Sequence, residues 1–454
     1  MLHRSLIKQY MCKISCLLLL CFFIICQAKA VNPKYVILIT IDGMHAGMVT
    51  EPEMPSPFLK MMKREGIFVE KVKGVPPTAT YPSHTTIATG ALPIHHNIYY
   101  NAPFVFNKDS VVSYWYADSI KATTIWQVAK EAGMKTASLF WPVSTGSRWI
   151  DYNVPEFWSV KRVSNQLDYI KPYCTPKGIL EELEANAVGR LNWTTFSAGS
   201  INRDARTAYM ANYIMNKYQP NLMTIHLTTT DYAQHATGMN SEKTKMTVAS
   251  ADNAVGLILE NLKLTHRMDS TTVIVCGDHG FTNIEKALAP NVWLAKAGLL
   301  SERPGGEWKA CFHGNGSCMF LYLKDDNDKK TLKQVEEIIG KLPKETRDLF
   351  RVVSREELIQ LGGDPKVALA IEPKLGIKVI TQRTGEDVVS KKGGSHGYFS
   401  GIDPTTFIVY GCGIEEKGKV IDTIRQIDIA PYVMHLLGID YKFADGELPQ
   451  ALLE

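Results

Sequence analysis

Aspartates, histidines or both stand at four places along the chain, and these residue types can bind metal ions. These places are Asp42-Gly43, Asp231 with His235, Asp278-His279-Gly280 and Gly394-Ser395-His396-Gly397. Carboxylates and imidazoles without a thiolate suit zinc better than manganese or iron. Six such ligands are enough for two metal ions. Taken singly, the first place could be a turn and the second a surface hydrogen bond at i,i+4 spacing.

A hydroxyl group in the stretch Val75–Thr86 could act beside such metals. Prolines at 76, 77 and 82 stiffen this stretch, and Ser83–Thr89 then predicts a helix that Gly90 ends. The Thr80 hydroxyl would face the free N–H groups and positive dipole end of that helix, where phosphate binds well. A phosphate-directed nucleophile and an ordinary helix cap are both consistent with this position.

Three apolar runs predict the strands that position the ligands. Tyr35–Ile41, Asn221–Thr228 and Thr271–Cys276 read as strands buried on both faces, and each precedes an acidic residue of the candidate set. The carboxyl ends of parallel strands lie along one edge of a sheet, so the ligands should converge there. The predicted fold is α/β, with a mostly parallel central sheet flanked by helices. Helices are expected near 57–65, 124–132, 204–218, 241–264 and 427–437.

The composition changes between residues 285 and 390. This region has a charged run at Lys324–Lys330, an amphipathic stretch at Leu332–Leu342 and a turn at Gly362-Gly363. It shows no metal-ligand spacing. We predict a smaller α+β insertion at about 285–390 within one catalytic domain, residues 31–454.

The first thirty residues are typical of a secretory signal peptide. Basic residues precede an apolar run, Ile14–Cys26, and Ala28-Lys29-Ala30 matches a cleavage site. An uncleaved membrane anchor is the alternative. We predict cleavage after Ala30, a periplasmic or secreted location, and no stable membrane span afterwards. The net charge of +4 and the lack of a basic run argue against specific nucleic-acid binding.

Five cysteines follow residue 30, in a chain predicted to be exported. Cys311 and Cys318 flank a glycine-rich loop, so they form either a local disulfide or two free thiols.

The motifs in this order resemble the nucleotide pyrophosphatase/phosphodiesterase family of the alkaline phosphatase superfamily. The resemblance covers almost the whole chain after residue 30, and its combination of motifs is specific. The matching motifs are Asp42-Gly43, Pro77-Thr78-Ala79-Thr80-Tyr81-Pro82-Ser83-His84, Asp231-x-x-x-His235, Asp278-His279-Gly280 and Gly394-Ser395-His396-Gly397-Tyr398. The expected fold is alkaline-phosphatase-like.

The resemblance implies a role for each candidate residue. Thr80 would be the nucleophile, and Asn101 would bind a phosphoryl oxygen. One zinc ion would be held by Asp231, His235 and His396. The second would be held by Asp42, Asp278, His279 and the Thr80 oxygen.

By this resemblance the chain is an exported, zinc-dependent phosphodiesterase or nucleotide pyrophosphatase. It would hydrolyse small-molecule phosphate diesters through a phosphothreonine. A phosphomonoesterase with the same two-metal site is the alternative. Tyr81 is expected to bind the leaving group, whereas His226 stands where nucleotide-cleaving relatives have a second aromatic. The sequence leaves the natural substrate and the oligomeric state open.

Overall fold

The computed structural model describes residues 32–106, 113–158, 165–314, 316–399 and 401–453. The predicted signal peptide lies outside these residues. Among the described helices, none combines the length and apolarity needed to cross a bilayer.

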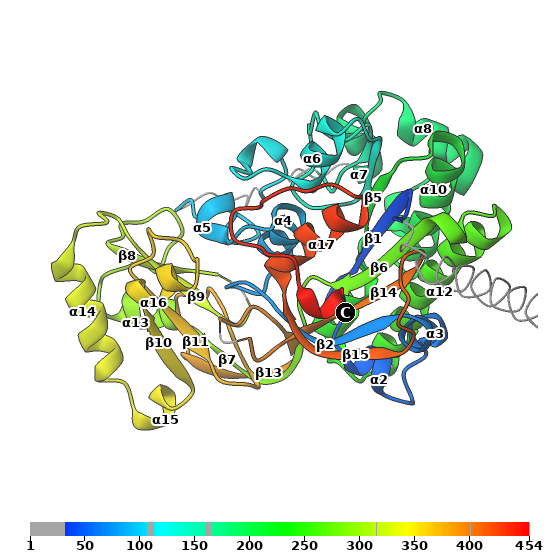
Figure 1. Cartoon of the computed structure of the whole chain (residues 1–454). Helices are drawn as coiled ribbons and strands as arrows, with labels where there is room; N and C mark the ends of the chain where they lie inside the picture. Colours follow the sequence, from blue (N-terminus) through cyan, green and yellow to red (C-terminus); the bar gives the residue numbers. More distant parts are fainter. Residues whose placement is uncertain (1–31, 107–112, 159–164, 315, 400, 454) are drawn as a thin grey trace, which may run out of the picture.

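A mixed sheet of eight strands forms the centre of the molecule (Figure 1). β1 (Tyr35–Ile41) lies between β5 (Leu222–Leu227) and β6 (Thr271–Gly277), and all three run parallel. Every residue of these strands is buried, as their β-branched composition predicts. The full order is β15-β2-β14-β6-β1-β5-β3-β4, with β14 antiparallel to both neighbours. The other strands are β2 (Ile67–Lys73), β3 (Thr136–Leu139), β4 (Tyr152–Val154), β14 (Thr405–Gly411) and β15 (Lys419–Arg425).

Helices cover both faces of this sheet. Because side chains alternate along a strand, Ile37 and Ile39 of β1 belong to one core and Val36 and Leu38 to the other. The first core includes α3 (Pro57–Glu65), α10 (Arg203–Tyr218) and α12 (Glu242–Leu264). The second includes α4 (Thr80–Thr89), α6 (Ile125–Glu131) and α17 (Ile429–Leu436). The predicted mostly parallel α/β sheet is therefore confirmed.

A second, antiparallel sheet lies beside the central one, at the left of Figure 1. Its order is β10-β11-β9-β8, and it has its own hydrophobic core around Trp293 and Phe312. Its strands are β8 (Ala310–His313), β9 (Met319–Leu323), β10 (Phe350–Ser354) and β11 (Leu369–Pro373). Its helices are α13 (Pro290–Lys296), α14 (Lys329–Gly340), α15 (Lys344–Arg347) and α16 (Arg355–Gln360).

A small third sheet completes the fold. It has the order β12-β7-β13, with β12 (Ile377–Val379), β7 (Thr282–Leu288) and β13 (Val388–Ser395). β7 begins just after His279 and β13 ends just before His396, so this sheet positions two candidate ligands. The remaining α-helices are α2 (Gly47–Thr50), α5 (Pro93–His96), α7 (Gln166–Ile170), α8 (Ile179–Leu183), α9 (Trp193–Phe196) and α11 (Thr229–Thr237).

Cys311 and Cys318 are free, buried thiols. In the β8–β9 hairpin, Cys311 pairs with Tyr322, four residues along the strand from Cys318. Four residues of strand span about 13 Å, which is too far for a disulfide. The hairpin register therefore explains why no bridge forms.

Candidate metal centre and nucleophile

The candidate ligands meet at the carboxyl edge of the central sheet. Asp42 follows β1, Asp278 and His279 follow β6, and α11 follows β5 with Asp231 and His235 on it. His396 reaches the same place from the end of β13. Two groups of three ligands form there, each with its ligand atoms within 4.8 Å of one another.

The first group consists of Asp231, His235 and His396. Oδ1 of Asp231 lies 3.2 Å from Nε2 of His235 and 3.6 Å from Nε2 of His396. Each histidine donates a hydrogen bond from Nδ1 to a backbone carbonyl, at Gly394 and Thr78 respectively. These bonds fix the ring orientations and leave each Nε2 free to act as a ligand.

The second group consists of Asp42, Asp278 and His279. Nε2 of His279 lies 3.3 Å from Oδ1 of Asp42 and 3.3 Å from Oδ2 of Asp278. Nδ1 of His279 donates to the carbonyl of Gly280, so this Nε2 is also free. The rings of His279 and His396 stack with 3.5 Å between centroids, which brings the two groups side by side.

Three buried carboxylate oxygens in these groups have no hydrogen-bond partner among the described residues. They are Oδ1 of Asp42, Oδ1 of Asp231 and Oδ2 of Asp278. A buried ionised oxygen without a partner is costly, and a bound cation removes that cost. Together with the three free Nε2 atoms, these oxygens fit two zinc ions.

The pKa values reflect this crowding of charge. Burial, and then the charges of Asp278 and Asp231, raise the pKa of Asp42 well above its ordinary value. Burial raises the pKa of Asp278 to about 6. Burial also acts to raise the pKa of Asp231, but the charges of His235 and His396 outweigh it and hold this pKa below its ordinary range.

Thr80 is the first residue of α4, and its hydroxyl lies 3.5 Å from Nε2 of His279. The sequence predicts this helix only from Ser83, so the expected start is three residues too late. Pro82 fits the first turn, where its missing N–H has no helical partner to lose. The capping position belongs to Ala79, so Thr80 is not the helix cap.

Asn101 lies beside Thr80. Its side-chain oxygen accepts a hydrogen bond of 3.0 Å from the backbone N–H of Tyr81. The oxygen is therefore occupied, and the side-chain NH2 group of Asn101 is left to donate to a ligand. The Tyr81 side chain is only 4% exposed, and its hydroxyl donates to Oε1 of Glu156 at 3.0 Å. This burial argues against the predicted use of the Tyr81 ring as a stacking surface.

The structure gives two further residues a contact at the site: His226, which the sequence places only where relatives have an aromatic, and Glu156, which the sequence does not assign. His226 in β5 lies 3.2 Å from Oδ2 of Asp42, and Glu156 lies on the other side of His226. A histidine inside an apolar strand needs polar partners, so the sequence already indicated that His226 contacts polar residues. Glu156 lies outside every predicted element, and nothing near it in the sequence indicates its partner.

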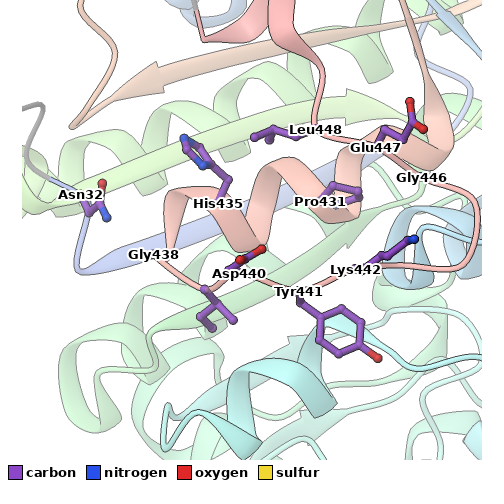
Figure 2. Close-up of a pocket in the computed structure, with 11 residues that line it drawn as sticks. Asn32, Pro431, His435, Gly438, Asp440, Tyr441, Lys442, Gly446, Glu447 and Leu448 are labelled. Atoms are coloured by element: carbon purple, nitrogen blue, oxygen red, sulfur yellow. The ribbon is translucent and has the colours of Figure 1, made fainter.

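A surface pocket of about 460 Å³ lies elsewhere on the molecule, along α17 and the segment that follows it. Figure 2 shows His435 and Pro431 of α17 on its wall, with Asp440, Lys442 and Glu447 from the C-terminal segment. None of the candidate ligands lines this pocket, so it is separate from the metal centre.

Part of the chain is similar in sequence to known proteins. The chain is 26% identical over 254 residues to mouse (Mus musculus) ectonucleotide pyrophosphatase/phosphodiesterase family member 3, and the match covers 54% of this chain and 24% of the relative. It is 23% identical over 282 residues to mouse family member 7, covering 58% and 56%. The chain thus spans about a quarter and about half of the length of these two relatives.

Solved structures share the fold. Human ectonucleotide pyrophosphatase/phosphodiesterase 5 superposes with a TM-score of 0.65 at 17% identity, covering 91% of this chain and 97% of that one. An inactive variant of the murine enzyme in complex with AMP gives a TM-score of 0.64, also at 17% identity, covering 90% and 97%. These likenesses establish the fold alone and confirm the predicted alkaline-phosphatase-like class.

The family model described as type I phosphodiesterase / nucleotide pyrophosphatase matches residues 36–399. This range runs from β1 to just beyond His396 and includes every candidate site residue. The chain belongs to the type I phosphodiesterase / nucleotide pyrophosphatase family.

Proposed function

We propose that the protein is a zinc-dependent phosphodiesterase that hydrolyses small phosphate diesters through a phosphothreonine at Thr80. The observation that carries this proposal is the set of three partnerless buried carboxylate oxygens, together with the Thr80 hydroxyl at a helix N-terminus, 3.5 Å from Nε2 of the candidate ligand His279. Nucleotides are the substrate class that the relatives' names and the AMP complex of the murine enzyme favour.

The two groups of ligands would each hold one zinc ion. Asp231, His235 and His396 would hold one, and Asp42, Asp278 and His279 the other, with the Thr80 oxygen nearby. Zinc ions bound in this way would supply Lewis acidity that stabilises negative charge on the attacking and leaving oxygens.

The chain's own residues position the reactants. The oxygen of Thr80 attacks phosphorus, the bond from phosphorus to the leaving oxygen breaks, and the leaving oxygen takes up a proton. Water then hydrolyses the phosphothreonine, which releases the phosphate monoester and restores the hydroxyl. The Asn101 amide, held by the backbone N–H of Tyr81, donates toward the phosphoryl oxygens, where negative charge accumulates.

A diester is favoured over a monoester by the charge of the site. A monoester carries one more negative oxygen, which an added cationic group would have to stabilise. The candidate catalytic residues and ligands include no lysine or arginine. A phosphomonoesterase with the same nucleophile remains the second candidate.

The test compares two substrates and one variant in the full chain. With zinc added, we expect bis-p-nitrophenyl phosphate to be cleaved much faster than p-nitrophenyl phosphate, and chelation to abolish both activities. Thr80→Ala should abolish turnover while the protein remains folded, whereas Thr50→Ala, at an exposed threonine that ends α2, should change nothing. Near-normal turnover by Thr80→Ala would refute the mechanism, and the reverse substrate preference would support the monoesterase.

We also propose that the protein is exported and that residues 1–30 are its signal peptide. Their basic start, apolar run and Ala28-Lys29-Ala30 site support this. We further propose that residues 285–390 form an inserted subdomain within the catalytic domain, which the separate core around Trp293 and Phe312 supports. N-terminal sequencing of the purified protein tests the cleavage after Ala30.

A further inference from the structure

His226 is a fully buried polar residue in the strand next to β1. It is 1% exposed, and its register partner on β1 is Thr40. Its Nε2 lies 3.2 Å from Oδ2 of Asp42. Its Nδ1 lies 3.2 Å from the carbonyl oxygen of Phe140 and 3.4 Å from Oε2 of Glu156.

All these neighbours offer hydrogen-bond acceptors. A buried carboxylate oxygen needs a donor, and an imidazole supplies one through a ring N–H. The 3.2 Å contact therefore makes Nε2 of His226 the donor to Oδ2 of Asp42, with Glu156 on the opposite side of the ring.

This contact determines which oxygen Asp42 can offer to a metal. His226 occupies Oδ2, while Oδ1 has no partner and lies 3.3 Å from Nε2 of His279. The backbone of Asp42 is also held on both sides, because its N–H donates to Leu227 and its carbonyl accepts from Thr230. Asp42 thus presents a single oxygen in a fixed direction.

A third metal ion is the alternative occupant of this space, since His84, His226 and Asp278 could also surround one. Both nitrogens of His84 are engaged, however. Nδ1 donates to the carbonyl of Thr80 at 2.8 Å, and Nε2 lies 2.8 Å from the Thr40 hydroxyl. His84 therefore has no ring nitrogen left to offer a third ion.

The same network reaches the nucleophile. Oε1 of Glu156 accepts from the Tyr81 hydroxyl, and Tyr81 directly follows Thr80. We propose that His226 is a positioning residue that bridges Asp42 and Glu156, restricts Asp42 to one metal-binding oxygen and links the metal centre to the first turn of α4. This inference rests on the proposed two-metal function, and its test reads metal binding rather than turnover.

The experiment measures zinc affinity of the full chain by competition with a chromogenic chelator. His226→Phe keeps a ring but removes the Nε2 donor, and we expect one of the two zinc equivalents to bind about 10- to 100-fold more weakly. His226→Gln keeps one N–H donor for Asp42 and should recover most of this loss. His96→Phe is the matched control, because His96 is another fully buried histidine that bonds to Thr86, away from the ligands; its zinc affinity should be unchanged.

A second measurement uses the wild type alone. In protein labelled with ¹⁵N-histidine, Nε2 of His226 should carry a proton that exchanges slowly with solvent, as expected of a buried donor to Oδ2 of Asp42. An Nε2 without a proton, or equal zinc affinity in wild type, His226→Phe and His226→Gln, would overturn the inference. If the wild type itself binds no zinc, the proposed function fails instead, so the two failures are distinguishable.

Discussion

Asp278→Asn should stabilise the metal-free protein while destroying its metal centre. Asp278 is fully buried, and its Oδ1 accepts from the backbone N–H groups of Gly43 and His279. Its Oδ2 has no partner and lies 3.3 Å from Nε2 of His279. An asparagine can keep the bonds from Gly43 and His279 through its side-chain oxygen. Its NH2 group then stands in place of Oδ2 and can donate a hydrogen bond to Nε2 of His279.

The magnitude follows from the pKa of Asp278, which burial raises from 3.8 to about 6. One pKa unit corresponds to about 1.4 kcal/mol, so ionising this group in the metal-free fold lowers the free energy of unfolding by about 3 kcal/mol. Between the two pKa values the folded protein binds more protons than the unfolded chain. The stability of the metal-free protein therefore falls as the pH rises from about 4 to about 6, and stays lower above that range.

The assay is urea unfolding of the full chain in the presence of a chelator, followed by tryptophan fluorescence at about pH 7.5 and about pH 4. At the higher pH the variant should be more stable than wild type by up to about 3 kcal/mol, and at the lower pH the two should agree. Asp231→Asn is the matched control, for which we expect the opposite change in the free energy of unfolding. The pKa of Asp231 lies below its ordinary range, so its charge stabilises the fold at neutral pH and its loss should destabilise. The reasoning is refuted if Asp278→Asn is no more stable at pH 7.5, or if its gain is equal at both pH values.

Further predictions concern the nucleophile loop and the hairpin. Asn101→Ala should lower kcat about 100- to 1,000-fold with little change in fold, because it removes one donor to the phosphoryl oxygens; steady-state kinetics test this. Tyr81→Phe should lower the free energy of unfolding by about 1–3 kcal/mol, because it leaves Oε1 of Glu156 without its donor; urea unfolding tests this, and unchanged stability would contradict it. The wild type should give the same thermal unfolding temperature in oxidising and reducing buffer, since Cys311 and Cys318 are free thiols; a difference that Cys311→Ser abolishes would show a bridge.

Much of the ligand set could be predicted because it lies where strands end. Asp42 and Asp278 directly follow strands of apolar, β-branched residues. Such strands can be recognised from the sequence alone. Once the strands are taken as parallel, their carboxyl ends must share one edge, and the ligands must approach one another. Local pattern and one rule of topology were sufficient for this part of the site.

The remaining features depend on contacts that no local pattern encodes. Glu156 meets His226 across 70 residues of sequence, and only the folded chain shows that their side chains face each other. The start of α4 was missed because Pro82 reads as a loop residue, although the first turn of a helix accommodates it. The spacing of Cys311 and Cys318 leaves a disulfide and two free thiols open, and only the strand register decides for free thiols by keeping the two residues apart.

Metal affinity and instability of the metal-free site have the same physical origin. The partnerless oxygens of Asp42 and Asp278 are held in place by bonds to their other atoms, through His226 and through Gly43 and His279. Because these bonds prevent the carboxylates from turning toward other donors, the metal-free fold retains their mutual repulsion. A cation that binds there gains that same free energy in addition to its coordination. Loosening His226 should therefore weaken metal binding even though every ligand atom is still present.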